Sequence, residues 1–146
     1  MWYNPVMTGA QRVVRILGLP ERQRQKSLVD LVRGGLPVSA FEHLASYTQL
    51  TRELLADAAA IPLRTVQRRK ASKQRFQPDE SDRLTRIARL YDHAETVLGS
   101  RENAATWMQA PNWVLDGTRP IELADTEVGA REVEDALGRI DDGIFA

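Results

Sequence analysis

Residues 51–75 read TRELLADAAAIPLRTVQRRKASKQR, and this stretch predicts two short helices joined by a tight turn. Thr51 is a good N-cap for the first helix. The apolar residues of that helix fall on one stripe, formed by Leu54, Leu55 and Ala58. The turn falls at residues 60–61, and Pro62 suits the first turn of the second helix because its missing N–H would have no partner there. Two helices joined in this way, the second of them basic, form a helix-turn-helix pattern.

Positive charge is concentrated in the second helix and in the residues that follow it. Residues 60–75 contain six Lys or Arg and no carboxylate. The major groove of DNA admits one α-helix, and Arg, Gln and Thr side chains on such a helix reach base edges or phosphates. We therefore predict a DNA-binding helix, with an outward face of Arg64, Thr65, Gln67 and Arg68 and with phosphate contacts from Arg69, Lys70, Lys73 and Arg75. The alternative interpretation is a solvated surface helix.

Two features limit what this helix-turn-helix can do alone. Its turn carries Ala60 at a position where a left-handed backbone is wanted, and alanine in that conformation costs on the order of 1 kcal/mol. A single recognition helix also makes few phosphate contacts, so we expect a dimer or larger assembly on a repeated or palindromic site. Residues available for self-association are Tyr91, Val97 and Leu98, although core packing explains them equally well.

Composition and charge narrow the class of protein. The chain has 146 residues, 42% of them apolar, which is the length of one domain or two very small ones. It has no cysteine and no apolar run of the roughly 20 residues that span a bilayer, so we expect a cytoplasmic protein without membrane contact. The formal net charge of zero hides a gradient, because residues 64–89 carry nine bases and three acids, whereas residues 116–146 carry three bases and nine acids. Such asymmetry favours a polyanion-binding surface in one place and a different partner in another, or simply two solvated faces.

Helical periodicity extends over most of the chain, and no segment alternates as a strand does. The longest periodic segment runs from Pro78 to Leu98. Its inward residues are expected to be Leu84, Ile87, Ala88, Tyr91, Ala94 and Leu98. Further helices are expected over residues 22–32, 39–47, 103–110, 120–123 and 126–140. The second of these begins with a capping box at Ser39 and Glu42, and the last is capped by Thr126. We therefore predict an all-α fold, preceded by a frayed arm over residues 1–20 that includes a short helix at 13–17.

The sequence does not indicate catalytic chemistry. The two histidines, His43 and His93, lie on separate predicted helices without the spacing of a metal pair. The phosphate-cradling patterns G-x-x-x-x-G-K and G-x-G-x-x-G are absent, as is the nucleophile elbow G-x-S-x-G. The clustered acids Glu132, Glu134, Asp135, Asp141 and Asp142 could in principle bind a cation, but a helix rich in acids is more often just solvated. We expect no enzymatic activity, no cofactor and no metal site.

A wider set of motifs surrounds the helix-turn-helix and spans roughly residues 30–146. It consists of the helix start P-x-E-S-D-R-L, the spacing W…PN…L-x-G…P-I-E-L and the terminal R-I-x-x-G. In the segments LTRELLADAAAIPLRTVQRRKASKQRFQPDESDRLTRIARLYDHAETVLG and APNWVLDGTRPIELADTEVGAREVEDALGRIDDGIF, the chain resembles the Xre/MbcA/ParS antitoxins, which are partners of RES-domain toxins. The resemblance covers about four fifths of the chain.

The resemblance implies an antitoxin that is not an enzyme. In such modules the toxin consumes NAD or transfers ADP-ribose from it, and the antitoxin binds the toxin directly and blocks its active site. The antitoxin, alone or in complex, represses its own operon. The implied division is a flexible arm over 1–20, an Xre-like helix-turn-helix and dimerisation region over 21–99, and a small helical toxin-binding domain over 100–146. The implied partners are the cognate toxin, operator DNA and a second copy of the chain.

The resemblance also implies that toxin contacts begin near Trp107. The residues expected to make these contacts are Trp113, Arg119, Glu122, Arg139, Asp141, Asp142, Gly143, Ile144, Phe145 and Ala146. A pocket that holds the NAD diphosphate should present Arg or backbone donors, which the tail carboxylates could meet while Ile144 and Phe145 fill apolar space. We call this the plug hypothesis; its alternative is a frayed, solvent-exposed terminus.

Other interpretations stay open at this point. For Trp107 and Trp113, closure of a small C-terminal core is favoured over direct partner contact. The whole chain could also be a stand-alone regulator whose C-terminal part dimerises or senses a ligand, or an assembly adaptor with no role at DNA.

Overall fold

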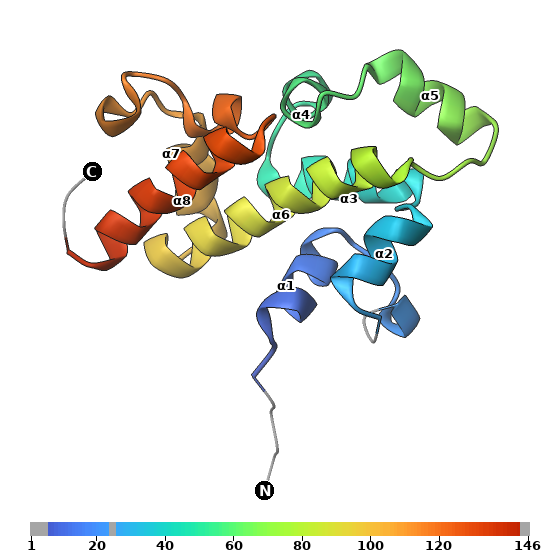
Figure 1. Ribbon diagram of the computed structural model, residues 1–146, viewed down its shortest axis with the longest axis horizontal. Coiled ribbons are helices and arrows are strands. Elements are labelled where there is room, and N and C mark those ends of the chain that lie inside the picture. Colours follow the sequence, from blue (N-terminus) through green and yellow to red (C-terminus); the bar gives the residue numbers. More distant parts are fainter. Residues whose placement is uncertain (1–5, 24–25, 144–146) are drawn as a thin grey trace, which may run out of the picture.

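The computed structural model describes residues 6–23 and 26–143 and is all-α, as predicted (Figure 1). Within these residues there is no β-strand, only an isolated bridge between Asn112 and Thr118. In chain order the elements are α1 (Gly9–Ile16), the 3₁₀ helix η1 (Glu21–Gln23), α2 (Leu28–Gly34), α3 (Val38–Thr48), α4 (Arg52–Ala59), α5 (Leu63–Ala71), α6 (Pro78–Leu98), α7 (Arg101–Gln109), the 3₁₀ helices η2 (Trp113–Leu115) and η3 (Pro120–Leu123), and α8 (Glu127–Asp141).

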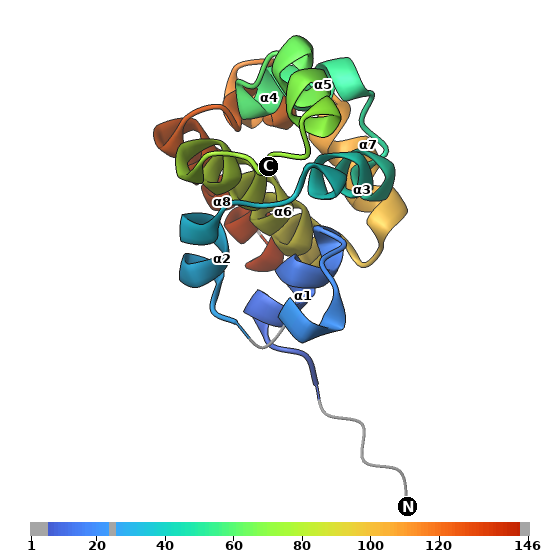
Figure 2. The same ribbon diagram turned by 90° about the vertical axis from the view of Figure 1, so that its right-hand side faces the viewer.

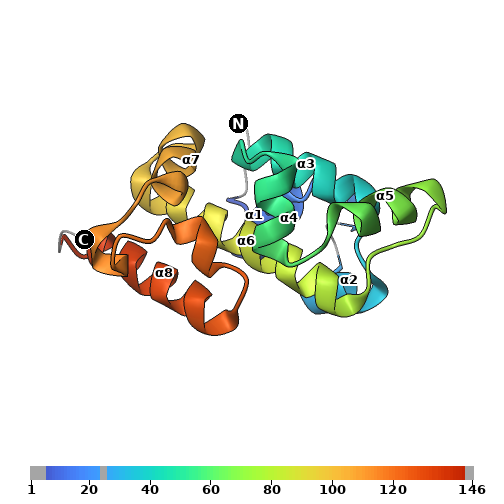
Figure 3. The ribbon, with the colours of Figure 1, turned by 90° about the horizontal axis from the view of Figure 1, so that it is seen from above.

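The long helix α6 runs through the middle of the molecule and contacts most of the other helices (Figures 1 and 3). Its first half lies beside α2 and α4, and its second half lies beside α7 and α8. Most of the predicted inward residues are buried, namely Leu84, Ile87, Ala88, Tyr91 and Ala94, while Leu98 is half-buried. Gln77 and Glu80 form a capping box at the start of this helix. Since Tyr91 is buried, it is not available for self-association, and this part of the prediction is wrong.

The predicted helix-turn-helix is formed by α4 and α5. The side chain of Thr51 caps α4 by accepting a hydrogen bond from the backbone N–H of Leu54. Ala60 has the left-handed conformation predicted for the turn, with φ of 52°. The guanidinium of Arg83, on α6, donates to the carbonyl oxygens of Ala59 and Ala60 over 2.6 and 3.4 Å. A cation at the C-terminal end of α4 is electrostatically favourable and offsets part of the strain at the turn.

The N-terminal region differs from the predicted flexible arm. Residues 9–16 form a complete helix, and Thr8 and Gln11 make a capping box at its start. Its apolar residues enter the main core and include Val13, Val14 and Ile16, followed by Leu17 and Leu19. Arg12 forms an ion pair of 2.8 Å with Asp92 of α6. The expectation of an arm is therefore corrected for residues 9–19, because their apolar side chains are covered by α3 and α6 (Figure 2). Residues 1–5 lie outside the described residues.

Two predicted helix starts are also corrected. The capping box at Ser39 and Glu42 does not form, because Ser39 lies inside α3, whose N-cap is Pro37, two residues earlier, and Pro37 offers no side-chain cap. The helix expected over residues 22–32 begins only at Leu28, where the hydroxyl of Ser27 accepts a hydrogen bond from the backbone N–H of Asp30. Thr126 caps α8 as predicted, through a hydrogen bond from the N–H of Gly129.

An ion pair fastens the end of α5 to the start of α6. The Nη1 atom of Arg69 lies 2.8 Å from the Oε1 atom of Glu80, and each side chain is only 11% exposed. The same Nη1 atom donates to the carbonyl oxygen of Arg75 over 3.1 Å, and Glu80 also accepts from the backbone N–H of Gln77 over 2.7 Å. The loop between the two helices is therefore closed by one guanidinium and one carboxylate.

We expect Arg69→Ala to destabilise the fold by about 3 kcal/mol, because removing one member of a buried ion pair leaves the other charge uncompensated. Arg68→Ala is the matched control, since Arg68 is exposed on the same helix and takes part in no ion pair within the described residues. Its stability should lie within about 0.5 kcal/mol of the parent. Urea denaturation followed by circular dichroism measures both; equal stability of the two variants would contradict the structural role of Arg69.

Two glycines of α8 provide a second paired test. A Cβ at Gly129 would overlap the carbonyl oxygen of Leu123, whereas one at Gly138 would meet no atom of the described structure within 4 Å. Gly129→Ala should therefore destabilise the protein by about 1–3 kcal/mol through forced displacement of η3. Gly138→Ala should instead stabilise it by about 0.5–1 kcal/mol, because alanine loses less conformational entropy in a helix. Thermal unfolding of both variants should show shifts of opposite sign.

Candidate nucleic-acid interface and partner-binding face

The outward face of α5 presents basic and amide groups to solvent. Arg64, Gln67 and Arg68, spaced at i, i+3 and i+4, are all exposed, and so are Lys70 and Lys73. No carboxylate lies within ion-pair distance of the four cations among them in the described part of the chain. Their charges are therefore available to an external anion such as a phosphate backbone.

Three of the predicted DNA-binding residues are placed differently. Thr65 and Arg69 lie one turn apart on the inward face of α5 and are each only 9% exposed. Thr65 therefore does not belong to the outward face, and the charge of Arg69 is already compensated by Glu80. Arg75 is exposed, but its Nη1 atom donates to the carbonyl oxygen of Gly35 over 3.0 Å. Helical spacing alone did not reveal which partners cover these side chains.

At the other end of α6, residues 112–118 form a closed loop. The backbone N–H of Asn112 donates to the carbonyl oxygen of Thr118 over 3.2 Å, and the N–H of Gly117 donates to the carbonyl oxygen of Asn112 over 2.8 Å. The buried side chain of Asn112 accepts a further hydrogen bond, of 3.0 Å, from the N–H of Val114. These bonds fix the loop without help from a partner.

The loop holds Trp113 out in solvent, where 75% of the residue is exposed. The prediction that both tryptophans close the C-terminal core is therefore wrong for Trp113. Trp107, on α7, is half-buried and packs against the core. The indole of Trp113 is exposed because η2 turns its side chain away while Leu115, two residues later, fills the interior. An exposed tryptophan on a rigid loop is the kind of residue that anchors protein–protein interfaces.

Arg119 and Glu122 form a local pair at the start of η3. Their Nη2 and Oε1 atoms are 3.0 Å apart, and the backbone N–H of Arg119 also donates to Glu122. The side-chain hydrogen bond from Arg119 is the main cause that lowers the pKa of Glu122 below its ordinary value. Both side chains are accessible, but their charges compensate each other in the free protein.

The exposed side of α8 carries Arg139, Asp141 and Asp142, followed by Gly143. The opposite side of this helix is buried and includes Ala130, Val133, Ala136 and Leu137. The remaining predicted contact residues, Ile144, Phe145 and Ala146, lie outside the described residues, so their placement is not tested.

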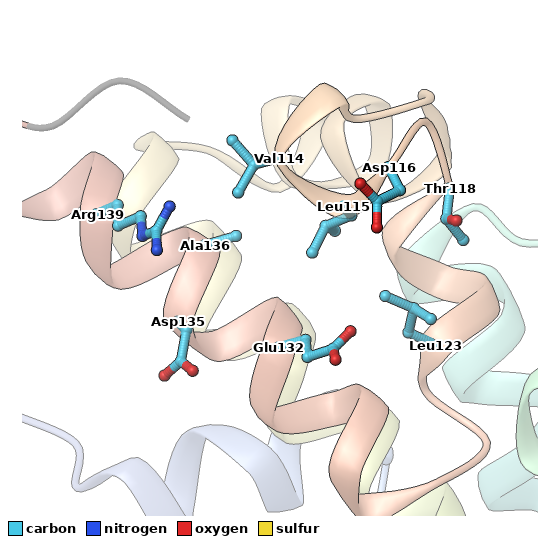
Figure 4. Close-up of a pocket in the computed structure, with 9 residues that line it drawn as sticks. All are labelled: Val114, Leu115, Asp116, Thr118, Leu123, Glu132, Asp135, Ala136 and Arg139. Carbon is cyan, nitrogen blue, oxygen red and sulfur yellow. The ribbon is translucent and has the colours of Figure 1, made fainter.

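A hollow of about 400 Å³ separates the loop from α8. The close-up in Figure 4 shows Asp116 on the loop side and Glu132 and Arg139 on the helix side. The sequence did not identify Asp116 as a site residue, and Glu132 was interpreted as a solvated acid. The two residues are 16 positions apart in the sequence and lie on different elements. Only the observation that this region is strongly acidic pointed towards them.

Features of other classes of site are not found in the described residues. No group of three or more His, Cys, Asp or Glu side chains is placed to hold a metal ion there. Over the same residues, no helix has both the length and the apolar character that crossing a bilayer requires. His43 has a local structural contact, since its Nδ1 atom lies 2.9 Å from the carbonyl oxygen of Ile16.

Comparison with known families matches both parts of the chain. Residues 27–89 match the antitoxin Xre-like helix-turn-helix domain, and residues 93–143 match the C-terminal toxin-binding domain of the Xre/MbcA/ParS antitoxins. The first match contains α2 to α5 and most of α6, and the second contains the end of α6, the 112–118 loop and α8.

Similar proteins occur in several bacteria. A protein named Antitoxin Xre from Yersinia enterocolitica is 34% identical over 146 residues, covering 99% of this chain and 98% of the relative. Another Antitoxin Xre, from Photorhabdus laumondii, is also 34% identical and covers 90% of this chain and 89% of the relative. A Sphingobium protein named Prs ADP-ribosylating antitoxin is 24% identical, over 81% of this chain and 80% of the relative. With a matching helix-turn-helix, a matching toxin-binding domain and relatives of nearly equal length, the chain belongs to the Xre/MbcA/ParS family of antitoxins.

Proposed function

We propose that this antitoxin binds a RES-domain toxin, blocks its NAD-consuming active site and represses its own operon through α5. The observation that carries the proposal is the separation of two exposed surfaces along α6. Helix α5, with its basic face, lies near one end of that helix, and η2, which carries the exposed Trp113, and the C-terminal end of α8 lie near the other; the ribbons of Figures 1 and 3 show these elements. One molecule can therefore contact DNA and a toxin without the two partners competing for the same surface.

The proposed DNA contacts follow the exposure of α5. Arg64, Gln67 and Arg68 would read base edges, and Lys70 and Lys73 would contact phosphates. Because one helix offers few contacts, we propose that two copies of the chain bind paired half-sites of the operator. We keep the domain division proposed from the sequence, at residues 21–99 and 100–146, with α6 in the first part and packed against α7 and α8 of the second.

The proposed block of the toxin relies on the end of the chain. An NAD pocket must offer hydrogen-bond donors to a diphosphate, and Asp141 and Asp142 can meet such donors. The residues after Gly143 would enter the active site as the plug. Autorepression and enzyme inhibition would then be performed by opposite ends of one protein that is not itself an enzyme.

We expect the combined change Arg64→Ala, Gln67→Ala and Arg68→Ala to weaken operator binding by about thirtyfold or more. Two or more base contacts are lost, each worth about 1–3 kcal/mol. Arg131→Ala is a suitable control, because Arg131 is an exposed arginine on α8, far along the chain from α5. Fluorescence anisotropy with labelled promoter DNA measures the affinity. If the triple variant binds the promoter DNA as tightly as the parent, the proposed role of α5 in operator binding is contradicted.

Deleting residues 143–146 should restore most of the toxin's NAD consumption while leaving complex formation largely intact. The plug would be gone, but Trp113 and the exposed side of α8 would still hold the toxin. NAD turnover by the purified complex and thermal unfolding of the truncated antitoxin are the two measurements. Full inhibition by the truncated protein would show that the tail is not the plug, and copurification of no toxin with the complete chain would favour a stand-alone regulator.

A further inference from the structure

The hollow between the 112–118 loop and α8 has the form of a receptor for one side chain of a partner. Its apolar lining is formed by Val114, Leu115, Leu123 and Ala136. Acids line its walls, and in Figure 4 the carboxylates of Asp116 and Glu132 extend from opposite walls towards the gap. Asp135 also borders it, with its carboxylate directed away in the same view, and Arg139 closes one end.

The acids of this hollow are not compensated in the free protein. Neither Asp116, Glu132 nor Asp135 has a Lys, Arg or His within 4.0 Å in the described part of the chain. Two neighbouring acids differ in this respect, because Glu122 is paired with Arg119 and Glu127 with Arg86 and Arg131. Arg139 is the one cation among the described residues that line the hollow, and three acids line it, so the hollow carries an excess of negative charge.

One wall of the hollow is ordered in advance. Asp116 has a left-handed backbone, with φ of 56°, and its N–H donates to the carbonyl oxygen of Trp113. Because the hydrogen bonds of Asn112 close the loop, the backbone that carries the Asp116 carboxylate loses little conformational entropy when a ligand binds. Trp113 precedes Val114 of the lining in the chain and is exposed, but it does not itself line the hollow.

We propose that this hollow receives an arginine side chain from the toxin, an inference that rests on the proposed toxin-binding function. A guanidinium is flat, with weakly hydrated faces that suit the apolar lining and with N–H donors at its edge that suit carboxylates on two walls. The contact is separate from the plug, because it uses the loop and the middle of α8 rather than the last residues of the chain.

The test is the double variant Asp116→Asn with Glu132→Gln. Both changes keep the size of the side chain and remove its charge, and asparagine tolerates the left-handed backbone at position 116. The probe is the RES-domain toxin proposed above as the partner, titrated by isothermal calorimetry at two salt concentrations. We expect the Kd of the double variant to rise at least tenfold and to depend less steeply on salt than that of the parent.

Glu134→Gln is the matched control, because Glu134 lies on α8 between the lining residues but does not line the hollow. Its Kd should stay within a factor of two or three of the parent. Thermal unfolding and operator binding of the double variant should match the parent and show that the fold is intact.

The outcomes separate the two levels of the proposal. If the unchanged antitoxin does not bind the RES-domain protein at all, the proposed function fails, and this inference fails with it. If the unchanged antitoxin binds but the double variant binds equally well, or the control loses as much affinity, only the arginine receptor is overturned. A loss confined to the double variant supports the receptor.

Discussion

The other elements depend on the buried face of α6, against which they pack. Charged and polar side chains along the edge of that face set their positions. Along this one helix, Glu80 binds Arg69 of α5 and Arg83 binds the turn after α4. Further along, Arg86 contacts the carbonyl oxygen of Ala124 and the carboxylate of Glu127, at the start of α8. Other polar contacts of α6 join Ser81 to the backbone N–H of Leu36, Asp92 to Arg12 and Glu95 to Tyr47. Apolar burial supplies most of the stabilisation, and these contacts select one arrangement among many that would bury similar area.

Much of the fold could be predicted from periodicity and caps, since these are local properties. The extent of α6, the left-handed turn at Ala60 and the cap of α8 at Thr126 all depend on residues within one or two turns. The helix at Gly9–Ile16 was predicted only in part, as a short helix at 13–17 within a frayed arm, because it is short and its stability comes from packing against distant elements. The capping box at Ser39 was wrong because the pattern S-x-x-E occurs inside helices as well as at their starts.

The candidate sites were predicted less completely, because they depend on contacts across the sequence. Spacing correctly placed Arg64, Gln67 and Arg68 on one exposed face, but it could not show that Glu80 compensates Arg69. At the other end, hydrophobicity favoured a buried Trp113, whereas the hydrogen bonds of the 112–118 loop hold it in solvent. The hollow beside it is formed only when Asp116 and Glu132 are brought together by the fold.

The neutral net charge is compatible with two strongly charged surfaces because they are far apart. With 21 residues, α6 spans about 30 Å at a rise of about 1.5 Å per residue. The Debye length in cells is about 8 Å, so the field of the acidic end is largely screened at the basic face of α5. DNA binding can therefore use the cations of α5 without repulsion from the acids near α8. By the same reasoning, any coupling between toxin and operator would have to act through the shared helix or through assembly of several copies, and not through long-range charge.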